Sequence, residues 1–133
     1  MVAAILALGV GLTLWDFDAP APDMARDEPV LPRFSTLAIA GNMAYDRNCA
    51  SCHGVNALGG DRGPPLLHDI YNPGHHNDDS FYRAASRGTP QHHWKFGDMP
   101  PQPQASRRQI AAIIRYIREL QEANGIVWKK HTM

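Results

Sequence analysis

Cys49-Ala50-Ser51-Cys52-His53 is the stretch of sequence that decides how the whole chain is interpreted. Cys49 and Cys52 are the only cysteines among 133 residues, so no set of disulfides is spread along the chain. If this stretch is helical, its two thiols lie on one turn and can both attach to one planar group. The imidazole of His53, the next side chain along, then lies below that group and can bind a metal ion at its centre.

Three chemistries use such a pair of cysteines. A Cys-x-x-Cys-His string is typical of covalent haem attachment, in which each thiol adds to one vinyl group and forms a thioether. A thioredoxin-like dithiol would need a neighbouring βαβ pattern, which this sequence lacks. Zinc bound by both cysteines and two later histidines stays open as an alternative, and so does a chance match. Haem attachment is the interpretation that the string favours.

Residues 35–126 have the sequence pattern of an all-α domain. Apolar residues recur at helical spacing over 36–48, and a second, shorter helix is predicted over 78–87. A third helix is predicted between Ser106 and Asn124, with isoleucines on one face. Loops rich in glycine and proline separate these elements, and no strand pattern is convincing. We therefore expect three to four helices.

The helix ends are predicted from residue types that cap helices. Ser106 and Gln109 have the spacing of a capping box, and Asn124-Gly125 is suited to end the last helix. Gly88 is placed to end the short helix, whose start is assigned to one of three polar residues, Asp78, Asp79 or Ser80.

Met99 is the candidate for a second iron ligand. Gly97 and Pro100 surround it with stiff, non-helical backbone, so this loop can close over the face of the haem opposite His53. A thioether is a soft ligand, and ligation by methionine and histidine raises the reduction potential of haem iron. Met43 lies within the first predicted helix and is interpreted as a packing residue instead.

These motifs occur in an order that resembles the class I cytochromes c, in the small monohaem bacterial group. The resemblance covers residues 36–123, nearly all of the predicted domain. The matching stretches are, in order, Cys49-Ala50-Ser51-Cys52-His53-Gly54, Gly63-Pro64-Pro65-Leu66, Gly97-Asp98-Met99-Pro100 and Tyr116-Ile117. The resemblance implies a cytochrome c-like fold, with the helices around one haem c that is covalently attached through two thioethers.

The resemblance also implies roles for individual residues at the haem. Cys49 and Cys52 would hold the haem, His53 would be the proximal iron ligand, and Met99 the distal ligand. Pro64 matches the family proline whose preceding loop supplies a carbonyl to the other ring nitrogen of the proximal histidine. Such a bond fixes the ring and tunes its basicity as a ligand.

Three further positions match the family outside the iron ligands. Gly41 and Tyr116 correspond to the place where the first and last helices cross closely, with glycine admitting the aromatic ring. Trp94 resembles an aromatic residue that lies beside a haem propionate, although an ordinary core aromatic is almost as good an interpretation.

The segment from His68 to Trp94 is unusually rich in histidine, which the resemblance does not explain. A loop histidine is usually a solvated polar side chain, but paired imidazoles also suit copper and zinc. A histidine could also compete with Met99 for the iron. The hypothesis that follows is weak copper or zinc binding by four residues, His75, His76, His92 and His93.

The N-terminal third differs in character from the predicted domain. Residues 2–15 are apolar and uncharged, but a helix of that length reaches only about 21 Å, short of the ~30 Å bilayer core. We therefore expect a signal peptide or a short membrane anchor over 1–18, followed by a proline-rich linker over 19–34. A basic C-terminal tail is predicted over 127–133.

Charge and motifs together define the expected function. Thirteen basic and thirteen acidic residues give a net charge of zero, which argues against nucleic acid as a partner. We expect a monohaem carrier of single electrons, not an enzyme, that meets redox protein partners transiently outside the cytoplasm, in or facing the periplasm. The alternative is a haem c subunit or module that serves a periplasmic dehydrogenase or oxidase complex.

Overall fold

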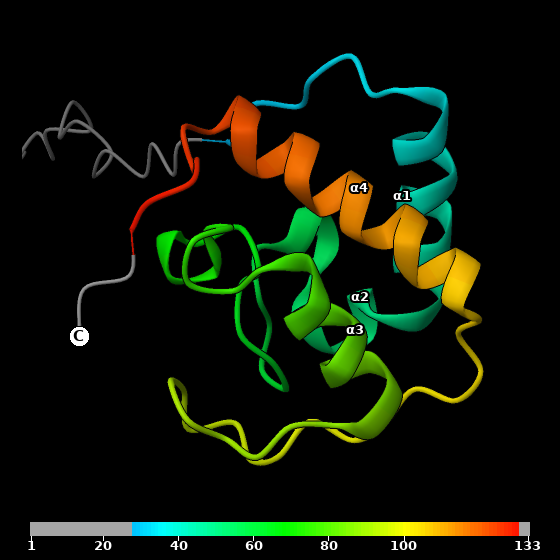
Figure 1. The fold of residues 1–133 in the computed structure, drawn as a ribbon, viewed down its shortest axis with the longest axis vertical. Helices are drawn as coiled ribbons and strands as arrows, with labels where there is room; N and C mark the ends of the chain where they lie inside the picture. The colour runs from blue at the N-terminus through cyan, green and yellow to red at the C-terminus, as the bar shows by residue number, and fades with distance from the viewer. Residues whose placement is uncertain (1–27, 131–133) are drawn as a thin grey trace, which may run out of the picture.

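The computed structural model describes residues 28–130, and helices are its only regular elements (Figure 1). They are, in chain order, α1 (Thr36–Asn48), α2 (Ala50–His53), η1 (Val55–Ala57), η2 (Asp69–Tyr71), α3 (Asp78–Arg87) and α4 (Arg107–Ala123). Among the described residues, β-structure is limited to two isolated bridges. The expected all-α class is therefore confirmed.

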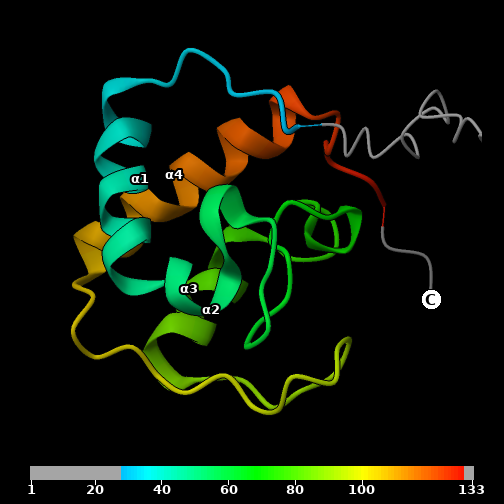
Figure 2. The same ribbon diagram turned by 180° about the vertical axis from the view of Figure 1, so that it is seen from behind.

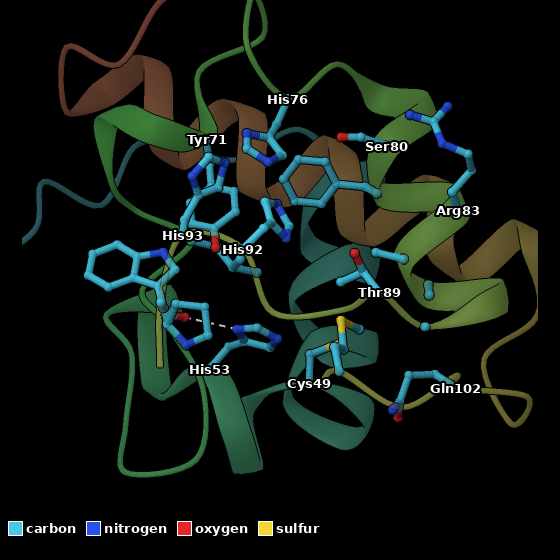
Figure 3. Close-up of a pocket in the computed structure, with 18 of the residues that line it drawn as sticks. Cys49, His53, Tyr71, His76, Ser80, Arg83, Thr89, His92, His93 and Gln102 are labelled. Atoms are coloured by element: carbon cyan, nitrogen blue, oxygen red, sulfur yellow. Dashed lines mark hydrogen bonds between the residues drawn. The ribbon is translucent and has the colours of Figure 1, made fainter. Parts of the chain in front are cut away.

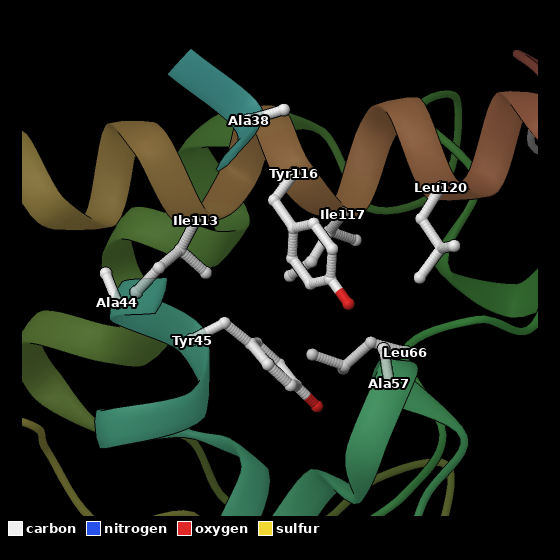
Figure 4. Close-up of a cluster of buried hydrophobic side chains, with 9 residues drawn as sticks. All are labelled: Ala38, Ala44, Tyr45, Ala57, Leu66, Ile113, Tyr116, Ile117 and Leu120. Carbon is white, nitrogen blue, oxygen red and sulfur yellow. The ribbon is translucent and has the colours of Figure 1, made fainter. Parts of the chain in front are cut away.

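The core of the domain forms where α1 crosses α4 (Figures 1 and 4). The buried side chains on the two helices include Ala38, Ala44 and Tyr45 from α1 and Ile113, Tyr116, Ile117 and Leu120 from α4. The rings of Tyr45 and Tyr116 meet in this core with their centroids 5.5 Å apart. Burial of this apolar face stabilises α1, a short helix that would be marginal alone.

Gly41 is required at the crossing because of the backbone opposite it. A Cβ at this position would lie 1.9 Å from the carbonyl oxygen of Ala112 and 3.0 Å from Cβ of Tyr116. The close approach predicted for Gly41 is present, but the nearest neighbour is the backbone of α4, whereas the sequence indicated the ring of Tyr116. The absence of a side chain brings the two helix backbones together.

The prediction that Met43 packs inside the domain is wrong. Its side chain is 56% exposed, and Leu37 and Ile39 on the same helix are exposed as well. The reason is the close crossing at Gly41, which leaves room on the buried face of α1 mainly for small residues. The longer aliphatic side chains therefore lie on the outer side of the helix.

Helix ends agree with the sequence except at the start of α3. The side chain of Asn77 caps α3 by accepting a hydrogen bond from the amide of Ser80 at 3.0 Å, so none of the three residues predicted as the cap is the cap. Asp78 and Asp79 lie inside the first turn, where negative charge complements the helix dipole. Gly88 ends α3 as predicted, with φ 75°.

The last helix begins as its sequence predicts. The Ser106 hydroxyl accepts from the Gln109 amide, and the Gln109 side chain accepts from the Ser106 amide, which completes the capping box. The two reciprocal bonds satisfy amides that the helix itself leaves without partners.

The N-terminal end of the described chain returns to the end of α4, and the C-terminal tail leaves from there (Figure 2). The backbone of Val30 exchanges two 2.9 Å hydrogen bonds with the side chain of Asn124, and the ring of Phe34 packs against Tyr116. In the tail, the ammonium group of Lys129 pairs with Asp69 at 2.6 Å. The predicted signal or anchor over 1–18, and the linker up to residue 27, lie outside the described residues. Within 28–130 no helix has the length and apolar character needed to cross a membrane.

Replacing Glu119 with glutamine is expected to lower the free energy of unfolding by about 1–2 kcal/mol. Glu119 accepts hydrogen bonds from the Ser35 hydroxyl at 2.6 Å, the Ser35 amide at 2.9 Å and Arg115 at 2.5 Å, which ties the start of α1 to α4. Burial raises the pKa of Glu119, but these bonds outweigh burial and hold the pKa below its ordinary value.

The effect of Glu119→Gln should depend on pH. Because the folded-state pKa is depressed, this carboxylate stabilises the fold fully above its unfolded pKa of about 4.3 and progressively less as pH falls through the folded value. Denaturant unfolding at pH 7 and at pH 3 measures the difference, with the exposed Glu122→Gln as a control of equal charge change. A difference from wild type that is the same at both pH values would contradict this account.

Candidate haem site

A cavity of about 550 Å³ opens between the α2 turn, α3 and the loop that follows α3 (Figure 3). Cys49, His53 and Pro64 line one part of it, and apolar side chains of α3 and α4 line another. The volume falls within the range of about 300–1,000 Å³ that is typical of cofactor pockets. The main cavity therefore has the size of a cofactor site.

The α2 turn brings the two cysteines and the histidine of the motif together. The helix α1 ends as the Cys49 amide donates to the carbonyl of Tyr45 at 2.7 Å, and the His53 amide then donates to the carbonyl of Cys49 at 2.9 Å. Cys49 and Cys52 therefore share one helical turn, as the spacing predicted, and both are half-buried. Burial, with a smaller contribution from Cys52, raises the pKa of the free Cys49 thiol to about 11.

His53 is held in one orientation by a single hydrogen bond. Its ring is buried, and Nδ1 lies 2.9 Å from the carbonyl oxygen of Pro64. A carbonyl only accepts, so Nδ1 carries the proton and Nε2 keeps its lone pair for a metal ion. Burial lowers the pKa of His53, against the opposing effect of the Pro64 bond, which favours the neutral imidazole that binds metals.

The acceptor at His53 differs in detail from the prediction. The sequence placed the carbonyl in the loop before Pro64, whereas the carbonyl is that of Pro64 itself. The loop is held below α2 by the Gly59 amide, which donates to the carbonyl of His53 at 2.7 Å, and by a bond from Gly60 to Gly63 at 3.0 Å. This closed loop places Pro64 directly at the ring.

Met99 lines the same cavities as His53. Its backbone exchanges two hydrogen bonds with Thr89, of 3.0 and 2.9 Å, so the loop that follows α3 closes on itself at this point. Met99 lines the main cavity and also a smaller one of about 110 Å³, and His53, Cys49 and Pro64 border both cavities too. The structure thus places the predicted methionine in the walls of the same two cavities as the predicted histidine.

Trp94 contributes a buried polar atom to the cavity wall. Its indole Nε1 is buried without a hydrogen bond of ordinary geometry, and its ring meets His68 edge-on at 5.1 Å. Burial raises the pKa of the nearby Tyr71 phenol, and the indole N–H opposes that shift. A buried donor without a hydrogen bond of ordinary geometry fits a cofactor that brings oxygen atoms of its own, as the carboxylates of haem do.

Sequence reasoning missed the part of the cavity wall that α3 provides. Phe81, Ala84, Ala85 and Gly88 all border the cavity, and they recur at helical spacing on one face. That period was the available signal. The period does not tell what the apolar face packs against, because a helix face that lines a cofactor site has the same pattern as one that lines a protein core.

All the sequence-predicted site residues meet around one space. Cys49, His53, Pro64, Trp94 and Met99 line the main cavity, and Cys52 lines the adjoining smaller one. Each group matches one part of a haem. The two thiols on one turn match its attachment points, the neutral buried imidazole and the thioether match its iron, and the buried indole donor matches its carboxylates. The residues present therefore fit the group that the motif implies.

The fold and the site define a class: small helical domains that enclose one haem and hold it covalently through a Cys-x-x-Cys-His turn. The chain belongs to the cytochrome c family, because the family model described as Cytochrome c matches residues 38–121. Neither the curated proteins nor the solved structures contain a significant match to the chain. Members of this family bind haem c, so the protein carries one haem attached by thioethers to Cys49 and Cys52.

Proposed function

We propose that this protein carries single electrons between redox protein partners outside the cytoplasm, with His53 and Met99 as the two residues that would ligate the haem iron. The observation that carries the proposal is that both residues border the same two cavities. Bound haem supplies an iron that changes its oxidation state by one electron. With both ligands supplied by the protein, the iron would have no vacancy for a substrate, which favours transfer over catalysis.

Each residue around the haem has a separate task under this proposal. His53 presents Nε2 to the iron, and its bond to Pro64 fixes the ring and increases its basicity as a ligand. Met99 supplies a soft thioether, which favours the reduced iron and raises the potential. Trp94 donates its indole N–H to a haem carboxylate, which would satisfy the buried donor in the cavity wall.

The haem edge near Met99 is the proposed place where partners dock. Phe96 lines both cavities and is 41% exposed, so apolar surface reaches solvent beside the haem. Exposed charged residues of both signs lie near the same edge, among them Arg62, Lys95 and Asp98. A small apolar contact with charged surroundings suits a fast, transient encounter.

Potentiometric titration of the holoprotein, followed by its absorption spectrum, tests the electron-transfer function. We expect a reversible titration with the slope of a single electron. Carbon monoxide added to the reduced protein at neutral pH should leave the spectrum unchanged, because Met99 occupies the sixth position. Rapid carbon monoxide binding would contradict this coordination and favour a ligand-binding role.

Replacing both Cys49 and Cys52 with alanine is expected to abolish covalent attachment. The double variant should show no haem stain on a denaturing gel, because no thioether remains, while each single variant should keep one link and some stain. Met43→Ala, on the outer side of α1, is the matched control and should stain like wild type. Stain retained by the double variant would contradict the assignment of these two thiols.

Export from the cytoplasm is proposed from the apolar run over residues 2–15, which lies outside the described residues. Fractionation of cells that express the full chain should place haem-stained protein in the periplasm or on the outer side of the membrane. Deletion of 2–15 should leave unstained protein in the cytoplasm. Stained protein in the cytoplasm would overturn the proposed location, and co-purification with a dehydrogenase or oxidase would identify a subunit of a complex.

A further inference from the structure

Four imidazoles gather in the wall of the main cavity. His75 and His76 come from the loop before α3, and His92 and His93 come from the loop after it. Figure 3 shows His76, His92 and His93 around the cavity. Ring centroids lie 4.6 Å apart for His75 and His76, 5.1 Å for His75 and His93, and 4.3 Å for His92 and His93. The fold therefore brings together two His-His pairs that the sequence places on separate loops.

Three of these side chains have the geometry of a metal site. His75, His76 and His93 each place one ring nitrogen within 4.8 Å of the nitrogens of the other two. The Nε2 atoms of His75 and His93 face each other at 3.2 Å. Two nitrogens that share a tetrahedral zinc ion at about 2.0–2.1 Å would lie about 3.3 Å apart. The pair thus already has the spacing of two ligands of one ion.

Hydrogen bonds to backbone carbonyls orient two of the rings. Nδ1 of His76 lies 2.8 Å from the carbonyl oxygen of Ile70, and Nδ1 of His92 lies 2.8 Å from that of Pro90. Because a carbonyl only accepts, both Nδ1 atoms carry protons and both Nε2 atoms keep lone pairs. A carbonyl on the far nitrogen is the arrangement that fixes metal-binding histidines elsewhere in proteins.

The loop that carries His75 and His76 is held in place from several sides. The side-chain oxygen of Asn72 accepts from the amides of Gly74 at 2.9 Å and His75 at 3.2 Å. Arg118 of α4 donates to the carbonyl oxygen of His76 and, at 2.8 Å, to that of Tyr71. This support does not depend on a ligand, so the two imidazoles are pre-positioned.

The cluster favours a cation over an anion. The Nδ1 protons of His76 and His92 point to backbone carbonyls, so their Nε2 atoms offer lone pairs to a cation. Phosphate or carboxylate would need protonated rings, whereas zinc and copper ions bind the neutral form.

We propose that His75, His76 and His93 bind one divalent transition-metal ion of the zinc and copper class, at a site separate from the haem iron. Three imidazoles leave a fourth position of the ion, and the further imidazole beside the cluster is that of His92, whose ring centroid lies 4.3 Å from that of His93. The site depends on the two loops around α3 and on Arg118, and it does not depend on which residues ligate the iron.

Zinc titration of the untagged holoprotein, after dialysis against a chelator, tests the proposal by calorimetry. We expect saturable binding of one zinc ion per chain. His93→Gln and His75→Gln should each weaken zinc affinity by at least about tenfold. This is the smallest loss that is typical even for a residue that only supports a metal ligand. His68→Asn is the matched control, because His68 lies in the same segment outside the cluster and asparagine keeps an acceptor for the Ile70 amide.

Unchanged haem absorption and circular dichroism will show that the variants are folded. Copper(II) added to the same proteins should give an electron paramagnetic resonance spectrum with nitrogen couplings, lost in His93→Gln and kept in His68→Asn. The absence of saturable binding to wild type would overturn the proposal. Equal affinity for wild type and both glutamine variants would overturn it too.

Discussion

Replacing Met99 with alanine is expected to open the sixth position of the haem iron and to lower its reduction potential by more than about 100 mV, within the ~0.8 V that axial ligands span. The thioether favours reduced iron, and water or hydroxide in its place would not. The reduced variant should then bind carbon monoxide. Because Met99 lines the cavity from a loop, its loss should leave the helices in place.

Spectroelectrochemistry and carbon monoxide binding measure this change, with Met43→Ala as the control. Met43 is the other methionine among residues 28–130, and its exposed position on α1 predicts an unchanged potential. A Met99→Ala protein with the wild-type spectrum and potential would show that another residue ligates the iron. His92, whose ring also borders the cavity, would then be the next residue to replace.

Replacing Gly41 with alanine is expected to lower the free energy of unfolding by at least about 3 kcal/mol, the upper end of ordinary overpacking costs. The new Cβ would lie 1.9 Å from the carbonyl oxygen of Ala112, and a backbone atom inside a helix cannot move aside alone. The helices α1 and α4 would have to separate, which loosens the core at Tyr116. In an exposed helix, glycine to alanine would raise the free energy of unfolding by about 1 kcal/mol. The sign of the change in unfolding free energy therefore tells whether the added Cβ meets the backbone of α4.

Chemical denaturation of the holoprotein, followed by circular dichroism, measures the effect of Gly41→Ala. Gly125→Ala is the matched control: this glycine has φ 75° and nothing within 4 Å of an added Cβ, so only backbone strain of about 1–2 kcal/mol applies. A Gly41→Ala protein as stable as wild type would mean that the helix crossing tolerates a side chain.

Predictions that depend on neighbouring residues agree with the structure except at the cap of α3. The bounds of α1 and α3 are those expected, and the Ser106 and Gln109 capping box is present. These features are set within a few positions of each other, by helical period and by side chains that bond nearby amides. The cap of α3 was missed by one residue because Asn77, Asp78 and Asp79 all suit the position and only backbone geometry separates them.

Predictions that depend on distant contacts were less complete. The exposure of Met43 follows from the approach of α4 at Gly41, which no local pattern reports. The number of histidines is read from the sequence, but the distances between them are not, because the two pairs lie on separate loops. The two pairs lie together because of how α3 packs and because Arg118 donates hydrogen bonds to carbonyls of the loop before α3.

The sequence by itself determined that this protein carries a covalent haem, because the spacing of Cys49, Cys52 and His53 is a local property of one helical turn. It also determined the helical class, through the period of its apolar residues. Only the tertiary structure decided that Met99 borders the cavities beside His53 and that two His-His pairs form one cluster. Those relations join residues far apart in the chain, and packing, not spacing, sets the distances between them.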